Sequence, residues 1–259
     1  LDAPEKAARA MAAMAAYHDI QKQASQEQPK LPEATQAADQ IIENATKHHQ
    51  SALDEFAAKQ LLAEYGVPVP KERVLNSLEE LTRTLEDFSF PLVLKANHPE
   101  ILHKTEKGLV FLNIETGAAA RQAYTAIQDR AGKAVPVIVG EMIPGTREFL
   151  AGVTDDPQFG KCVAFGVGGV LTEALTDIVY RVAPITEAQA AHMLSDIRTK
   201  KLLDPYRGMP PVDRAALACL ISRVSRIPFI HPEIREIDIN PIIISKDSPL
   251  AADALVLLK

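Results

Sequence analysis

The sequence predicts a mixed domain of the α/β or α+β class with substantial antiparallel sheet. Helical patterns alternate with short β-rich runs along the chain, so neither an all-helical nor an all-β fold fits. Several of the β-rich runs are joined by turns too short to hold a crossover helix, and such connections join antiparallel strands. The chain has 259 residues, 47% of them hydrophobic and 24% charged, which suffices for a sizeable globular core.

The first helix is expected over residues 3–23, an Ala- and Met-rich segment followed by a polar, Pro-containing stretch without periodicity. An isolated helix next to a linker cannot bury its own apolar face. We therefore assign residues 1–25 to a helix that belongs with a neighbouring domain or subunit, and residues 26–49 to a linker. Because residue 1 is a leucine inside a helical pattern, we expect the chain to be a piece of something longer.

The main domain is expected over residues 50–259, and capping signals mark its first helices. Ser51 and Asp54 form a capping box, and Gly66 ends the helix that follows. The stretch "SLEE" at residue 77 repeats this signal. Later helices are expected over residues 117–131, 186–199 and 212–226, and the strands over "PLVLKAN", "GLVFLNI", "AVPVIVG", "REFLAGVT", "KCVAFGV", "IREIDINPIIIS" and "ADALVLL".

The last two strands predict a metal site. Asp238 and Asn240 are two residues apart on a strand, so their side chains share one face of the sheet. A turn near Lys246 and Asp247 places Asp253 about opposite Asn240 on the returning strand. Oxygen ligands on one sheet face suit Mg²⁺ that is shared with phosphate oxygens. A solvated strand end with an edge charge fits the same residues.

Other polar residues interrupt apolar strands. Lys95 is costly to bury without an anion such as a nucleotide phosphate, although an exposed strand face also accommodates a lysine. Glu141 and Glu148 flank a Pro-Gly turn, where exposed backbone groups can bind an adenine edge or simply form a hairpin. The glycines at 166, 168 and 169 read GxGG, not GxGxxG, which argues against a dinucleotide-binding motif.

The connection "HPEILHKTEKG" over residues 98–108 is longer than a tight turn requires. His103 can accept a phosphoryl group on a ring nitrogen, and Lys104 and Lys107 can stabilise the charge of that group. A surface loop histidine without a catalytic role is the alternative.

Charge and composition exclude several classes of partner. The formal net charge is −6 with no dense basic block, which disfavours nucleic acid and anionic membranes as partners. Cys162 and Cys219 form no metal-binding pattern. No signal peptide opens the chain and no apolar run is long enough to cross a membrane, so a cytoplasmic location is expected.

Taken in order, several segments resemble one known family, the ATP-grasp domain of the NDP-forming acyl-CoA synthetases. This family includes ADP-forming acetate–CoA ligases and is related to succinyl-CoA synthetase β subunits. The resemblance covers about residues 50–259 and rests on "LDEFAAKQLLAEYGVPVP", "PLVLKANHPEILHKTEKGLVFLNI", "VIVGEMIPGTREFLAGVTDDPQFGKCVAFGVGGVLTEALTDIVYRVAPIT", "YRGMPPVD" and "REIDINPIII". It implies an ATP-grasp fold in which two α/β subdomains clamp a nucleotide, with a lid-like subdomain at about 68–138. It also implies that residues 1–25 are the tail of a preceding CoA-binding and ligase portion.

The resemblance also implies roles for individual residues. Lys95 matches the lysine that contacts nucleotide phosphates, Glu141 and Met142 match the hinge that receives adenine, and Glu148 matches a nearby acid. Asn240 and Asp253 match the magnesium-binding pair. His103, with Lys104, matches the histidine that carries the phosphoryl group between distant sites. Asp177, Glu173 and Arg181 match the segment against which that loop docks.

The implied reaction is reversible and couples acyl-CoA, ADP and phosphate to carboxylic acid, CoA and ATP through phosphohistidine. ATP or ADP and Mg²⁺ are the implied cofactors, and a CoA-binding domain or α subunit in an oligomer is the implied partner. A regulatory module of a protein lysine acetyltransferase and an unrelated ATP-grasp ligase remain alternatives. The acyl group and the choice between ADP and GDP stay open.

Overall fold

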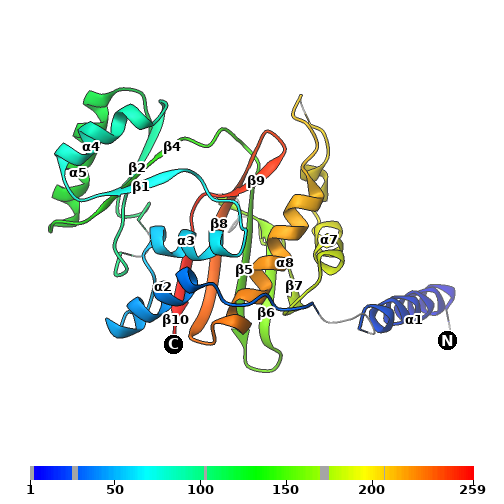
Figure 1. Ribbon diagram of the computed structural model, residues 1–259. Coiled ribbons are helices and arrows are strands. Elements are labelled where there is room, and N and C mark those ends of the chain that lie inside the picture. Colours follow the sequence, from blue (N-terminus) through cyan, green and yellow to red (C-terminus); the bar gives the residue numbers. More distant parts are fainter. Residues whose placement is uncertain (1–2, 25–28, 102–103, 170–174, 207) are drawn as a thin grey trace. The chain divides into compact units, whose positions relative to one another are not determined.

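A computed structural model of the chain describes residues 3–24, 29–101, 104–169, 175–206 and 208–259. The chain divides into two units, residues 1–30 and residues 31–259. The first unit contains the single long helix α1 (Pro4–Ala24), labelled in Figure 1, where the sequence predicts one. Its Met11, Met14 and Tyr17 side chains are exposed. No described helix is long and apolar enough to cross a membrane.

The predicted linker over residues 26–49 is wrong for much of its length. Residues Gln36–Lys47 form helix α2, which is capped by Thr35, whose hydroxyl oxygen accepts the Ala38 amide at 3.1 Å. Ala38, Ile42 and Ala45 are buried and join the core of the larger unit. Their spacing of four and three residues is that of one helix face. Ile41 packs against the same core, so the apolar residues at 38, 41, 42 and 45 follow the helical period and the helix is visible in the sequence.

A four-stranded antiparallel sheet forms one layer of the larger unit, in the strand order β1-β4-β2-β3. Its strands are β1 (Glu72–Leu75), β2 (Leu92–Ala96), β3 (Val110–Ile114) and β4 (Val137–Glu141). Helices α4 (Leu78–Thr84) and α5 (Gly117–Ala131), with the short η1 (Leu85–Asp87), share its hydrophobic core. These elements overlap the lid-like subdomain expected over residues 68–138.

A six-stranded antiparallel sheet forms the second layer, in the order β10-β8-β5-β6-β7, with β9 also paired to β8. Its strands are β5 (Glu148–Asp156), β6 (Gly160–Val167), β7 (Ile178–Val182), β8 (Ile234–Ser245), β9 (Ser248–Ala251) and β10 (Leu255–Leu258). The remaining elements are α3 (Glu55–Glu64), α7 (Glu187–Asp196), η3 (Lys200–Leu203) and α8 (Arg214–Ile230). The mixed fold with antiparallel sheets confirms the predicted class.

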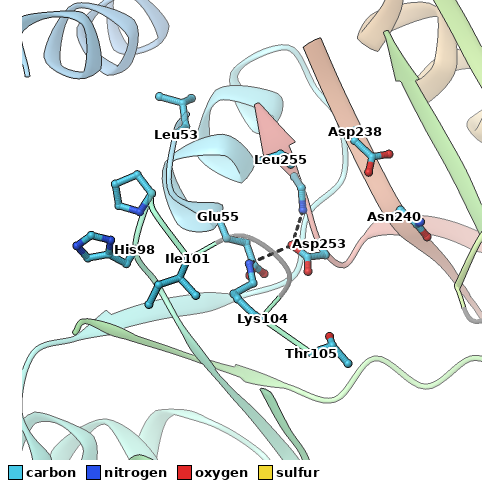
Figure 2. Close-up of a pocket in the computed structure, with 12 residues that line it drawn as sticks. Leu53, Glu55, His98, Ile101, Lys104, Thr105, Asp238, Asn240, Asp253 and Leu255 are labelled. Atoms are coloured by element: carbon cyan, nitrogen blue, oxygen red, sulfur yellow. Dashed lines mark hydrogen bonds and ion pairs between the residues drawn. The ribbon is translucent and has the colours of Figure 1, made fainter. Parts of the chain in front are cut away.

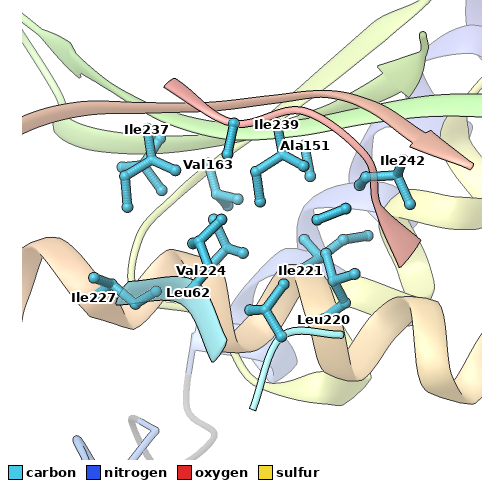
Figure 3. Packing of buried hydrophobic residues seen from close by; sticks show 14 of the residues in the cluster. Leu62, Ala151, Val163, Leu220, Ile221, Val224, Ile227, Ile237, Ile239 and Ile242 are labelled. Atoms are coloured by element: carbon cyan, nitrogen blue, oxygen red, sulfur yellow. The ribbon is translucent and has the colours of Figure 1, made fainter. Parts of the chain in front are cut away.

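Helix α8 covers one face of this sheet and supplies much of the core. Figure 3 shows its apolar side chains facing those of the strands, namely Leu220, Ile221, Val224 and Ile227 against Ala151, Val163, Ile237, Ile239 and Ile242. All nine are buried. Burying such side chains contributes roughly 1.5–3 kcal/mol each, so this layer stabilises the sheet whose strand β8 carries Asp238 and Asn240.

Helix α3 begins later than the capping box predicts. Ser51 and Leu53 run beside β10, because the Leu258 amide donates to the Ser51 carbonyl at 2.8 Å and the Leu53 amide to that of Val256 at 2.9 Å. Asp54 is the cap, and it accepts the Ala57 amide at 2.9 Å. The result is that Glu55 opens the helix and its side chain points inward beside Asp253 (Figure 2).

A buried histidine ties α2 to the end of α8. His231 Nε2 lies 2.5 Å from the Tyr65 hydroxyl, and His231 Nδ1 lies 3.7 Å from Asp39 on α2. Burial lowers the pKa of His231, although the carboxylates of Asp39 and Glu233 oppose the shift. The histidine is therefore neutral in the folded protein at neutral pH, and its Nε2 accepts the Tyr65 proton.

We expect the free energy of unfolding to fall as the pH drops below about 6.5, the ordinary pKa of histidine. The unfolded chain then binds a proton on His231 that the folded chain does not, so acid favours unfolding. Urea unfolding at pH 7.5 and pH 5.5 measures this loss, with His231→Gln as the comparison. The variant should lose less stability between the two pH values than the wild type. An equal loss of stability in the variant and the wild type would show that His231 is not the group responsible.

Candidate functional site

A cavity of about 240 Å³ lies between the two sheets of the larger unit. Its apolar lining comprises Val93, Val110, Leu112, Met142, Ile143 and Ile243. Its polar lining includes Lys95, Glu148 and Asp253. A slot that combines an apolar wall with several charged groups suits a ligand with a flat apolar part and an anionic part.

A second cavity adjoins the first, because Thr105 and Asp253 line both. Its polar lining also includes Glu55, Lys104, Asp238 and Asn240, which Figure 2 shows around a common space. The two cavities thus meet at Asp253, where α3, the middle of β8 and the connection between β2 and β3 converge.

Asn240 and Asp253 lie opposite each other, as the sequence predicts. The pairing of Ile242 with Ala251 in β8 and β9 and that of Asp238 with Leu255 in β8 and β10 share one register. Carried across the short gap between β9 and β10, this register places Asp253 against Asn240.

The oxygens of this pair fit a magnesium ion. Asn240 Oδ1 accepts the Gly169 amide at 2.9 Å, and Asp253 Oδ1 accepts the Ala254 amide at 2.8 Å. Burial, followed by the charge of Glu55, raises the pKa of Asp253, and a bound cation would offset that effect. Within the described residues no three His, Cys, Asp or Glu side chains gather as a metal cluster. Two protein oxygens leave positions for phosphate and water, which Mg²⁺ prefers.

Lys95 is buried and has an anion partner, but that partner is a protein carboxylate. Its Nζ donates to Glu55 Oε1 at 2.7 Å and to the Ala252 carbonyl at 2.9 Å. Burial alone would lower the pKa of Lys95, but Glu55, Asp253 and Glu72 together raise it. The lysine is therefore charged, and it faces the cavity that it lines.

Glu55 is a functional candidate that sequence reasoning missed. Its carboxylate accepts from Lys59 and Lys95, each at 2.7 Å, and from Lys104. Burial would raise the pKa of Glu55, but the three lysines lower it far below its usual range. Glu55 and Lys59 are four residues apart on one helix face, a pairing visible in the sequence. The convergence of Lys95 and Lys104 depends on tertiary contacts and is not visible there.

The hinge between β4 and β5 forms part of the wall of the first cavity. Glu141 Oε1 accepts the Ser89 amide at 2.8 Å, and the Met142 amide donates to the Pro91 carbonyl at 2.9 Å. These two groups hold the hinge in place, and both are already hydrogen-bonded within the protein. Ile143, the next residue, is half-buried in the cavity wall, and its amide has no hydrogen bond among the described residues. A ligand edge in the cavity would therefore meet Ile143.

Glu148 and Asn240 are brought together by a glycine. Gly169 has a φ of +65°, and a Cβ there would lie only 1.6 Å from Glu148 Oε2. Only glycine allows this approach. Its amide donates to Asn240, so the close packing holds the candidate metal ligand beside Glu148.

Asp177 and Arg181 line neither of the two cavities. Asp177 is buried and accepts from the amides of Arg198 and Thr199 at 2.9 and 2.8 Å and from the Thr199 hydroxyl at 2.5 Å. Burial would raise its pKa, but these hydrogen bonds lower it. Arg181 pairs with Asp196. His103 and Glu173 lie outside the described residues.

Residues 44–258 match a protein family described as an ATP-grasp domain. The chain belongs to the ATP-grasp family. Over 227 residues it is 40% identical to the β subunit of acetate–CoA ligase [ADP-forming] I from Pyrococcus furiosus, covering 85% of this chain and 97% of that one.

Two solved structures of an acetyl-coenzyme A synthetase 1 from Ca. Korarchaeum cryptofilum share the ATP-grasp fold of this chain. One, in complex with coenzyme A, Ca-AMPCP and HgCl⁺, has a TM-score of 0.82 and 33% identity, and the match covers 86% of this chain and all of that one. The other holds coenzyme A and Mg-AMPPCP, with its phosphohistidine segment pointing towards the nucleotide site. It has a TM-score of 0.76 and 34% identity with the same coverage.

Proposed function

We propose that the chain is the nucleotide-binding, phosphoryl-transferring part of an ADP-forming acyl-CoA synthetase. The observation that carries this proposal is the meeting of Lys95, Lys104, Asn240 and Asp253 at the junction of two cavities. Cations and oxygen ligands are what a magnesium-bound polyphosphate requires. The 40% identity to a β subunit of an ADP-forming acetate–CoA ligase supports the same activity.

In this proposal the nucleobase of ATP or ADP lies in the apolar slot, and the phosphates of the nucleotide point towards Asp253. Val93 and Ile243 belong to the apolar lining, and the Ile143 amide is proposed as the hinge donor to the nucleobase, since Ile143 lies in the same cavity wall. Lys95 contacts the phosphates. Mg²⁺, held by Asn240 and Asp253, would neutralise phosphate charge at the junction.

The reaction proceeds by transfer between histidine and nucleotide. Acyl-CoA and phosphate give an acyl phosphate and CoA on the partner portion, and a histidine there then takes the phosphoryl group and releases the carboxylic acid. His103 is proposed to carry it to ADP, which yields ATP and restores the imidazole. Catalysis of such a transfer depends on positioning and on stabilising phosphate charge. The partner is proposed to be a CoA-binding domain or α subunit, since the relative is itself a β subunit.

Calorimetric titration of the chain with ADP and ATP, with and without Mg²⁺, tests the nucleotide site. We expect binding that requires Mg²⁺ and that Asp253→Ala weakens at least about tenfold, as loss of a metal contact does. Asp247→Ala, in the exposed turn of the same hairpin, is the control and should bind as the wild type does. Absence of nucleotide binding by the wild-type chain would contradict a complete site within these residues.

A further inference from the structure

Two lysines from different segments of the chain share one carboxylate at the junction of the cavities. Lys95, on β2, donates to Glu55 Oε1 at 2.7 Å, and Lys104, on the connection between β2 and β3, pairs with Glu55 Oε2. Figure 2 shows Lys104 reaching Glu55 beside Asp253. The two ammonium groups are therefore set at neighbouring positions by the two oxygens of a single side chain.

Such an arrangement needs an anion between the lysines. Two like charges at this separation repel each other, and the low dielectric of a buried site strengthens the repulsion. Glu55 is 4% exposed and fixed at the first turn of α3, so it can hold both groups in place. The other partners of these lysines offset the repulsion less well than Glu55 does. Lys95 otherwise donates to an uncharged carbonyl, and Lys104 lies 3.5 Å from Asp253.

We propose that Glu55 is a positioning residue that builds a two-lysine clamp for the polyphosphate of the nucleotide. This inference rests on the proposed nucleotide site. Lys95 lines the first cavity and Lys104 the second, so phosphates at the junction meet both ammonium groups. Glu55 itself does not contact the nucleotide. It acts through the lysines.

The variant Glu55→Gln separates positioning from general damage. An amide has one acceptor oxygen, and its NH₂ group faces an ammonium as donor to donor, so at least one of the three lysines paired with Glu55 loses that partner, while Lys59 keeps its contact with Glu72. We expect ATP and ADP to bind at least about tenfold more weakly, the scale of one lost charge-assisted hydrogen bond. The affinity for AMP should fall less, and adenosine should bind as tightly as it does to the wild type. A loss that grows with phosphate number is the signature of a damaged clamp.

The matched control is Glu79→Gln, the same chemical change at an exposed position on α4. Calorimetry in Mg²⁺ with the adenosine series on both variants and the wild type gives the comparison. If Glu55→Gln does not fold, Glu55→Asp serves instead. It keeps the charge, but its carboxylate is one methylene short of reaching both lysines, so the same phosphate dependence is expected.

The outcomes are distinct. A phosphate-dependent loss in the Glu55 variant, absent from Glu79→Gln, supports the clamp. An equal loss of affinity for adenosine and ATP would show that Glu55 has a merely structural role. Unchanged or tighter ATP binding would show that the lysines do not need Glu55 to position them. Either result overturns the inference. Failure of the wild type to bind ADP would instead overturn the proposed function.

Discussion

Replacing His103 with Asn is expected to abolish acyl-CoA-dependent ATP formation by the complete enzyme, with a loss of at least about a thousandfold. The proposed transfer requires a nucleophilic ring nitrogen that forms a bond to phosphorus and later releases it. An asparagine amide has a similar size and polarity but no such nucleophile. ATP formation in the presence of the CoA-binding partner, acyl-CoA, ADP, phosphate and Mg²⁺ measures the effect.

Two further measurements make this result specific to phosphoryl transfer. Calorimetry should show that the His103 variant binds Mg·ADP as tightly as the wild type, because the nucleotide contacts proposed above come from other residues. The control variant His192→Asn, which replaces an exposed histidine on α7, should retain full turnover. If the His103 variant keeps more than about 10% of wild-type turnover, the barrier has risen by less than about 1.4 kcal/mol, and the carrier role is wrong.

The elements predictable from sequence are those with strong local signals. The Ser77 cap of α4 is present, since its hydroxyl oxygen accepts the Glu80 amide at 3.1 Å. The opposition of Asn240 and Asp253 follows from strand periodicity and a short turn. The start of α3 was not predictable in the same way, because pairing with β10 keeps the backbone at Ser51 and Leu53 extended. Helix α2 was predictable, since Thr35 caps it and its apolar residues follow the helical period, and the prediction of a linker overlooked this pattern.

The candidate site shows the same division. Lys95 stands out in the sequence because a charge inside an apolar strand needs an explanation. Glu55 does not, because an acid at the start of a helix is ordinary there and is expected to interact with the helix dipole. Its role depends on Lys104, 49 residues away in the sequence. Pairing across that distance is a product of folding and leaves no local pattern.

The largest effect on stability is expected for Lys59→Met. Lys59 is 1% exposed, and its Nζ lies 2.7 Å from Glu55 Oε1 and 2.5 Å from Glu72 Oε2. Removing the ammonium leaves the Glu72 carboxylate buried without its close cationic partner. Breaking a buried pair in this way costs roughly 3–5 kcal/mol, and we expect urea unfolding at pH 8 to show a loss of that size. Lys47→Met, which breaks the exposed pair with Glu43, is the control and should cost less than about 0.5 kcal/mol.

The pH dependence identifies the cause of this loss. Burial already raises the pKa of Glu72, and Lys59 is the nearest charge that opposes the shift. In Lys59→Met the carboxyl should bind a proton more readily in the folded state than in the unfolded state, so stability is regained as the pH falls. The deficit should therefore be smaller at pH 5 than at pH 8. Replacing Glu72 as well, in Lys59→Met/Glu72→Leu, removes the buried charge and should recover part of the loss at pH 8. A deficit that is independent of pH and is not relieved by the second substitution would mean that lost packing, and not an unpaired carboxylate, is responsible.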